Sequence, residues 1–364
     1  MSPAGRRQIP RTRLAHLLIA LALVGCTDPG SVTAPTDSTG SLDLSLLGPE
    51  AQRRELATAA FALRRNESRL ARQPGLVAAA VGLTAAGRPA IRLYVDGPTL
   101  DDMPDEVDGF PVVRVRSGRV GALGLGPRDG PGSDAPRSLD FDTASRHRPA
   151  PSGVSIGHPA ETSGTLGALV RRGGTTYILS NNHVIARLGK ARIGEPVLQP
   201  GTIDGGTAAD RIASLSAFRP IVLHPTARNI ADAAIAEVSL IDAPVVTGLT
   251  PSYGKPRSRI IEASVGMRVM KYGRTTGHTT GVVEGVNAIV YVGYDEGTAR
   301  FVDQIVIRGA GFSAGGDSGS LVVVETGWPS RRPLGLLYGG SDDISVASPI
   351  GPVLEGFGAT IVGN

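Results

Sequence analysis

The stretch Gly315-Gly316-Asp317-Ser318-Gly319-Ser320 places one serine hydroxyl among glycines. Glycine on both sides permits a tight turn with positive φ, which exposes the serine side chain and aims backbone N–H groups at one point. A serine nucleophile needs this arrangement, because the N–H groups stabilise the oxyanion that forms when its Oγ attacks a carbonyl. A plain Gly-Ser loop between two strands is the alternative in a chain with 49 glycines. The stretch therefore indicates a nucleophile only if a base and a carboxylate accompany it.

Two further stretches supply candidates for the base and the carboxylate. His183 directly follows the run Tyr177-Ile178-Leu179-Ser180-Asn181-Asn182, so the end of a strand would hold it rigidly, as a general base requires. Asp232 begins the run Asp232-Ala233-Ala234-Ile235-Ala236, where a buried carboxylate would fix the tautomer of the histidine. Taken singly, such a histidine is more often structural, and such an aspartate is more often a turn residue. Two rival carboxylates lie in loops without an apolar frame: Asp204 and Asp210.

Together the three stretches resemble those of the chymotrypsin/trypsin-like serine peptidases, which have them in the same order, His, Asp, Ser. Ser180-Asn181-Asn182-His183 stands where that family has Ala-Ala-His, and Asp232-Ala233-Ala234-Ile235 where it has Asp-Ile-Ala-Leu. Gly316-Asp317-Ser318-Gly319 matches outright. Lys271-Tyr272-Gly273-Arg274-Thr275-Thr276-Gly277 is similar to the Gly-x-Thr-Thr-Gly stretch of bacterial members. The resemblance covers residues 155–364.

The resemblance implies a mainly β fold of two antiparallel six-stranded β-barrels with the active site between them. It implies a serine endopeptidase in which His183 deprotonates Ser318, Asp232 orients His183, and an acyl-enzyme forms and is hydrolysed. The backbone N–H groups of Gly316 and Ser318 would form the oxyanion hole. The implied partner is a peptide or protein substrate, and no metal or cofactor is implied. The residues expected to line the pocket for the substrate side chain are Phe312, Tyr338, Gly340 and Ser345.

These pocket residues carry no charge, so we expect cleavage after small or medium apolar residues and poor activity after Lys or Arg. The strand expected to run beside the substrate is Leu334 to Ser341, which resembles the family's Val-Gly-Ile-Val-Ser-Trp-Gly-Ser. Two carboxylates follow this strand, Asp342 and Asp343, and would change the preference if they folded over the pocket mouth.

The chain also departs from the family pattern. Val184 stands where trypsins have a disulfide-bonded cysteine, and Ser320 replaces the usual second glycine after the nucleophile. In activated trypsins the residue matching Asp317 pairs with a freed N-terminus, yet no Ile-Val-Gly-Gly start is present here. We therefore assign Asp317 no catalytic role. Two alternatives to a peptidase stay open: a catalytically silent binding module of the same fold on the cell surface, and a structural lipoprotein with a chance triad.

Residues 1–25 are typical of an export signal, with arginines up to Arg13 and then an apolar run too short to span a bilayer comfortably. The run ends in Leu23-Val24-Gly25-Cys26, similar to a bacterial lipobox in which Cys26 is acylated. Cys26 is the only cysteine, so no internal disulfide can form. An incidental or buried cysteine behind an ordinary signal peptide is the alternative. We expect an exported protein, lipid-anchored at the bacterial cell envelope on its periplasmic or extracellular side.

The charge balance argues against nucleic-acid binding. The formal net charge is +4, and residues 1–25 hold four of the 37 Lys and Arg residues and no acid. The rest of the chain carries 33 basic and 33 acidic residues and is formally neutral. Since affinity for nucleic acid depends on clustered positive charge, and no RNA- or DNA-binding motif is present, we exclude that class.

Composition divides the chain into five expected segments. The second segment, residues 26–45, is a tether composed mainly of Thr, Asp, Pro, Gly and Ser. Such a segment cannot bury enough apolar surface to fold. The next segment predicts a helix over 51–72 and strands over 76–83, 91–95 and 112–115. It holds no Ser/His/Asp cluster, so a pro-domain, a folding aid and an accessory binding module all stay open. The segments are a lipoprotein-type signal (1–25), a flexible tether (26–45), a small α+β unit (46–118), a Gly/Pro-rich linker (119–153) and the peptidase domain (154–364).

Short β-rich runs between glycine turns predict the strands of the last segment. These runs are 167–170, 177–180, 233–240, 281–286, 304–307, 321–324 and 334–338, with a C-terminal helix beginning near Val353.

Overall fold

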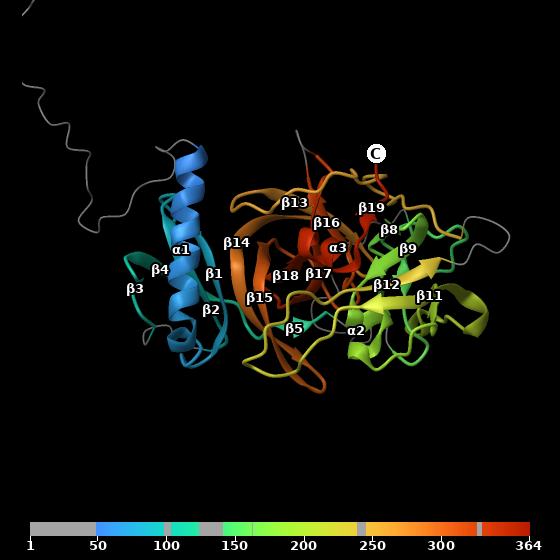
Figure 1. The fold of residues 1–364 in the computed structure, drawn as a ribbon, viewed down its shortest axis with the longest axis horizontal. Helices are drawn as coiled ribbons and strands as arrows, with labels where there is room; N and C mark the ends of the chain where they lie inside the picture. Colours follow the sequence, from blue (N-terminus) through green and yellow to red (C-terminus); the bar gives the residue numbers. More distant parts are fainter. Residues whose placement is uncertain (1–48, 98–102, 124–140, 162, 239–244, 326–329) are drawn as a thin grey trace, which may run out of the picture.

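The computed structural model describes residues 49–97, 103–123, 141–161, 163–238, 245–325 and 330–364 (Figure 1). Within these ranges the fold is mainly β, as the sequence predicted, with two large sheets and few helices. The expected signal, the tether, Cys26 and residues 124–140 of the expected linker lie outside the described residues.

The first large sheet has six strands, all in antiparallel pairs. In spatial order they are β10 (Pro196–Leu198), β11 (Arg211–Phe218), β12 (Ala234–Val238), β9 (Thr175–Ser180), β8 (Ala168–Arg172) and β19 (Thr360–Ile361). A two-stranded sheet of β6 (Ser155–Ile156) and β7 (Gly164–Thr165) accompanies it. The short helical turns of this region are α2 (Asn182–Ile185) and the 3₁₀ turns Arg187–Gly189, Thr202–Asp204 and Ala208–Asp210.

Six strands of the second large sheet pair in a closed antiparallel ring. Around the ring they are β13 (Arg268–Gly273), β16 (Leu321–Val324), β17 (Pro333–Gly340), β18 (Ser345–Pro349), β15 (Gly297–Arg308) and β14 (Gly277–Tyr294), which returns to β13. Helix α3 (Ile350–Phe357) follows β18 and leads to β19, so the end of the chain crosses back to the first sheet. The ring corresponds to the second six-stranded unit that the sequence predicted.

The N-terminal part of the described chain adds four strands to the second sheet, which reaches eleven strands together with β5 (Gly121–Ala122). It consists of α1 (Pro49–Leu70), β1 (Leu76–Leu83), β2 (Pro89–Val95), β3 (Glu106–Val107) and β4 (Phe110–Arg116), at the left of Figure 1. Strand β1 pairs antiparallel with the long strand β14, with Ala78 opposite Val290 and Ala79 opposite Ile289. The expected α+β unit thus shares a continuous sheet with the ring. That the unit is a domain of its own stays a prediction.

Helix α1 forms where the sequence predicts it, because its apolar residues recur on one face. Ala59, Leu63 and Leu70 of this face are buried against Leu93 of β2 and Ile289 of β14 in one hydrophobic cluster. The core of the N-terminal part therefore includes side chains of the ring.

A last short strand, β5 (Gly121–Ala122), lies within the range expected to be a linker. It pairs with both β14 and β17.

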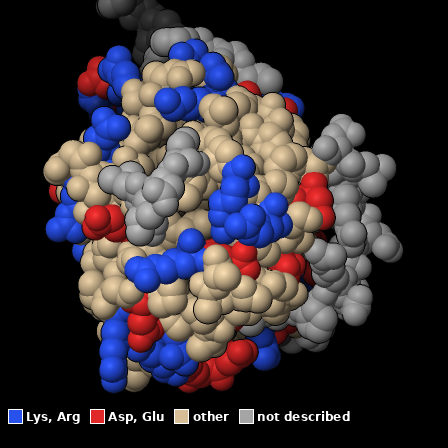
Figure 2. All heavy atoms as spheres, turned by 90° about the vertical axis from the view of Figure 1, so that its right-hand side faces the viewer, with Lys and Arg blue, Asp and Glu red and all other residues tan. Residues whose placement is uncertain are grey.

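On the face shown in Figure 2, basic and acidic side chains are interspersed with uncharged residues. This view therefore shows no large field of one sign on that face. Among the helices of the described ranges, none is both long and apolar enough to cross a membrane.

Candidate active site

Neighbouring strands of the first sheet bring His183 and Asp232 together. His183 lies in α2, just after β9, and Asp232 lies just before β12, which pairs with β9. The Nδ1 atom of His183 is 2.5 Å from Oδ2 of Asp232, and the backbone N–H of His183 donates to Oδ1 over 3.2 Å. Because an ionised carboxylate only accepts, Nδ1 carries the ring proton. The other ring nitrogen, Nε2, is buried and has no hydrogen-bond partner among the described residues.

Asp232 is fully buried, and two further side chains surround it. The Tyr294 hydroxyl donates to its Oδ2 over 2.9 Å, and the Asn181 side-chain amide donates to its backbone oxygen over 2.7 Å. Burial raises the pKa of Tyr294 well above its ordinary value, and the charge of Asp232 raises this pKa further. The phenol is therefore a neutral donor at physiological pH. Sequence reasoning missed Tyr294, because nothing in its local sequence connects it with Asp232.

Ser318 lies in the turn before β16, between two glycines with positive φ, Gly316 (φ 92°) and Gly319 (φ 95°). The turn packs against β7, where the Thr165 N–H donates to the Ser318 backbone oxygen over 2.8 Å. A Cβ on Gly164 would lie 2.5 Å from Val184, the neighbour of His183, and 3.0 Å from the same Ser318 oxygen. The turn thus lies beside the segment that carries the histidine.

The hydroxyl of Ser318 does not bond to His183 in this structure. It donates to the backbone oxygen of Tyr338 in β17 over 3.3 Å, while Nε2 of His183 has no partner among the described residues. The N–H of Gly316, one of the two expected oxyanion donors, donates to the backbone oxygen of Leu123 over 2.7 Å. The structure therefore joins the histidine to the aspartate but not to the serine.

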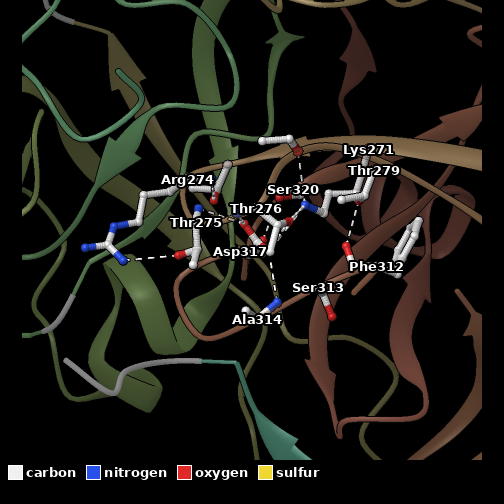
Figure 3. A network of polar contacts seen from close by, with 12 residues as sticks. Lys271, Arg274, Thr275, Thr276, Thr279, Phe312, Ser313, Ala314, Asp317 and Ser320 are labelled. Carbon is white, nitrogen blue, oxygen red and sulfur yellow. Dashed lines mark hydrogen bonds and ion pairs between the residues drawn. The ribbon is translucent and has the colours of Figure 1, made fainter. Parts of the chain in front are cut away.

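A buried ion pair holds the residue before Ser318 (Figure 3). The Nζ atom of Lys271 lies 3.2 Å from Oδ2 of Asp317, and both side chains are fully buried. Thr276 donates its hydroxyl to Oδ2 over 2.7 Å, and the Thr275 and Ala314 N–H groups donate to the same carboxylate. Burial lowers the pKa of Lys271, and the charge of Asp317 opposes this shift. The partner of Asp317 is thus an internal lysine, which lies in the stretch that resembles Gly-x-Thr-Thr-Gly.

The expected pocket residues fall into two groups. Gly340 and Ser345 lie together, because the Ser345 hydroxyl is 2.6 Å from that of Ser313 and a Cβ on Gly340 would lie 3.4 Å from the same Ser313 oxygen. Phe312 and Tyr338 are instead packed in the interior, 2% and 0% exposed. The Tyr338 hydroxyl has no hydrogen-bond partner among the described residues.

Across the described ranges, no group of three or more His, Cys, Asp or Glu side chains is placed to hold a metal ion. The side chains of Asp342 and Asp343 are exposed.

The model of the Nal1 C-terminal domain matches residues 257–347 of the chain, which include Ser318 but neither His183 nor Asp232. A sequence comparison with curated proteins finds no match.

Solved structures similar to this chain include a glutamic-acid-specific serine protease, at 21% identity and a TM-score of 0.43, over 58% of this chain and all of that one. Thermobifida fusca protease A matches at 21% identity and a TM-score of 0.43, over 59% of this chain and all of that one. The Cellulomonas bogoriensis chymotrypsin matches at 17% identity and a TM-score of 0.40, over 60% of this chain and all of that one. These matches, at low identity over about 58% of the chain, are to bacterial chymotrypsin-like serine proteases, the family that the sequence motifs resemble.

Proposed function

We propose that the chain is a serine endopeptidase that uses Ser318 as nucleophile, His183 as general base and Asp232 as the orienting carboxylate. The observation that carries the proposal is the buried bond between His183 Nδ1 and Asp232, beside which Nε2 has no hydrogen-bond partner among the described residues and lies next to the turn of Ser318. A neutral imidazole held in this tautomer accepts a proton at Nε2, and the buried carboxylate stabilises the imidazolium that results.

In the proposed reaction, Ser318 rotates its hydroxyl from the Tyr338 oxygen to His183 Nε2 and attacks a peptide carbonyl. His183 takes the serine proton and gives it to the leaving amine. Water then releases the acyl group by the same route in reverse. The Gly316 N–H and the Ser318 N–H would stabilise the oxyanion, and losing one such donor typically lowers the rate by about 10²–10³-fold.

A catalytically silent binding module is the second candidate, because the Ser318 hydroxyl bonds to the Tyr338 oxygen and not to His183. Labelling with a fluorophosphonate separates the two, since the reagent needs an activated serine. We expect stoichiometric labelling of Ser318 in the purified protein and none in Ser318→Ala or His183→Ala. A folded protein that stays unlabelled would favour the binding module.

We further propose that the protein is exported and anchored to the cell envelope by a lipid on Cys26. The lipobox-like Leu23-Val24-Gly25-Cys26 behind an apolar run supports this location.

A further inference from the structure

A segment of the chain itself lies against the candidate active site. The backbone oxygen of Leu123 accepts the Gly316 N–H over 2.7 Å, and the Leu123 N–H donates to the Tyr338 oxygen over 3.1 Å. The Gly316 N–H is a proposed oxyanion donor. The backbone oxygen of Tyr338 accepts a hydrogen bond from the hydroxyl of Ser318 as well as the one from Leu123. The carbonyl group of Leu123 therefore lies where the reacting carbonyl group of a substrate would lie. The N–H group of Leu123 is held beside Ser318 by the backbone oxygen of Tyr338.

The residues before Leu123 continue this arrangement as a strand. Strand β5 pairs antiparallel with β17, with Ala122 opposite Gly339 and Gly121 opposite Gly340. β17 includes most of the strand that the sequence predicted to run beside the substrate. A Cβ on Gly339 would lie 3.1 Å from the Gly121 oxygen, so the glycine lets the two backbones approach closely. Main-chain pairing of this kind is how extended peptides are bound by a sheet.

The side chains of the segment are buried in two apolar clusters. Leu123 is 9% exposed and belongs to the same cluster as Phe312 and Leu337. Val120 is fully buried in the cluster that contains Tyr338, and its backbone oxygen accepts the Gly293 N–H over 3.0 Å. Leu123 thus places a medium apolar side chain in the region expected to form the pocket.

We propose that residues 120–123 occupy the substrate groove as a substrate does, and that Ser318 cleaves the peptide bond between Leu123 and Gly124. This inference rests on the proposed function and names its first substrate, the chain's own segment. The segment also fills the groove, so an external peptide can bind only after residues 120–123 are displaced.

The step consumes one water. The Oγ atom of Ser318 bonds to the carbonyl carbon of Leu123, and its proton passes to Nε2 of His183. The carbon–nitrogen bond to Gly124 breaks, and the proton passes from His183 to the leaving amine. Water then adds its oxygen to the carbonyl carbon and returns a proton to Ser318 through His183. The products are a carboxyl group on Leu123 and a free amine on Gly124.

The test follows the full-length protein during incubation, by intact mass and N-terminal sequencing, beside Ser318→Ala. We expect the wild type to yield a fragment that begins at Gly124, while Ser318→Ala stays intact. A wild type that is labelled by fluorophosphonate at Ser318 but stays uncut, or is cut elsewhere, overturns the inference and leaves the proposed function standing. A protein that is neither cut nor labelled overturns the inference, and it overturns the proposed function as well if Ser318 also stays unlabelled in Leu123→Asp, whose side chain does not suit the apolar groove. Cleavage after Leu123 in Ser318→Ala also overturns the inference, because another peptidase must then cut.

Substitutions at Leu123 test whether its side chain directs the cut. Leu123→Asp should slow cleavage after residue 123 at least about tenfold, because a carboxylate would be desolvated without a partner. Leu123→Met keeps size and apolarity and should be cut at a rate close to the wild type. The control Leu249→Asp makes the same change at a leucine that is 46% exposed and should leave the rate unchanged. If Leu123→Asp were cleaved at the rate of the wild type, the inference would be overturned. A stable, folded Leu123→Met that is not cut would also overturn it.

Discussion

Tyr294 donates its hydroxyl hydrogen to Oδ2 of Asp232 over 2.9 Å, the same oxygen that lies 2.5 Å from Nδ1 of His183. The tyrosine ring also meets the imidazole edge to face, with centroids 5.9 Å apart and planes at 65°. Tyr294 is the last residue of β14, so the β14–β15 hairpin reaches from the second sheet to a carboxylate held by the first. These contacts make Tyr294 a candidate positioning residue, which would act through Asp232 and His183.

Tyr294→Phe should therefore lower kcat about tenfold and leave KM unchanged. A hydrogen bond to a charged group contributes about 1.5–3 kcal/mol, and each 1.4 kcal/mol corresponds to about tenfold in rate. Steady-state kinetics with a peptide substrate that is cleaved after a leucine gives kcat and KM. Tyr291→Phe, three residues earlier on β14, is the matched control and should behave as the wild type. An unchanged kcat in Tyr294→Phe would show that the other contacts of Asp232 suffice to hold it.

Asp232→Asn should lower kcat by about 10³–10⁴-fold with binding largely kept, because an amide no longer selects the tautomer with the proton on Nδ1. Asp210→Asn is the control at the rival carboxylate. Asp210 accepts from Thr207 and pairs with Arg146, and nothing described links it to His183. Peptide hydrolysis by both variants gives the comparison. Near-normal turnover in Asp232→Asn together with a loss in Asp210→Asn would reassign the third member of the triad.

Lys271→Met should destabilise the fold by about 3–5 kcal/mol, because it leaves Asp317 charged and buried without its cation. Urea unfolding measures the loss. Lys255→Met, at a half-buried lysine outside this network, should change stability by at most about 0.5 kcal/mol. The double variant Lys271→Met/Asp317→Asn should recover part of the loss, since the unpaired charge is gone. A single variant as stable as the wild type would contradict the importance of this pair.

Tyr338→Phe should keep or raise stability, by up to about 1–3 kcal/mol, because it removes a buried hydroxyl that has no partner among the described residues. Burial raises the pKa of Tyr338 well above its ordinary value of 10.0. Above about pH 10 the unfolded chain loses this proton and the folded protein keeps it, so stability is full below that pH and falls as pH rises. The variant should lose less stability in urea unfolding between neutral and strongly alkaline pH. An equal loss would mean that Tyr338 ionises freely in the folded protein.

Cys26→Ser should release the exported protein from membranes, because the thiol that carries the lipid is gone. Fractionation of cells and mass spectrometry of the N-terminus provide the measurement. The wild type should carry acyl chains on residue 26. An unmodified N-terminus beyond Cys26 in the wild type would contradict the anchor.

Local sequence was informative where a residue pattern reports local structure. The helix over 51–72 and the strand over 321–324 were confirmed, because a periodic apolar face determines the first and a short, fully buried apolar run determines the second. The glycines around Ser318 adopt the positive φ that the turn requires. The strands β11 and β13 were missed, because Ser216 and Lys271 interrupt their apolar pattern, and the fold buries Lys271 against Asp317.

The contacts of the site that sequence did not predict all join residues far apart in the chain. Tyr294 reaches Asp232 across 62 positions. The sequence predicted a linker over residues 121–123, because a strand of two residues shows no periodic pattern. Only its pairing with β17 identifies β5 as a strand. Backbone hydrogen bonds do not depend on the type of residue, so the pairing of β5 with β17 could not be predicted from the sequence.

The pairing of β1 with β14 has a consequence for solubility. Every sheet edge offers unpaired N–H and C=O groups that a strand from another molecule can take up. β1 covers that edge of β14 between Val286 and Val290. A molecule without residues 49–116 would expose it and would be prone to aggregate. A cut behind Leu123 would not by itself uncover the edge, because the hydrogen bonds between β1 and β14 do not depend on an unbroken chain.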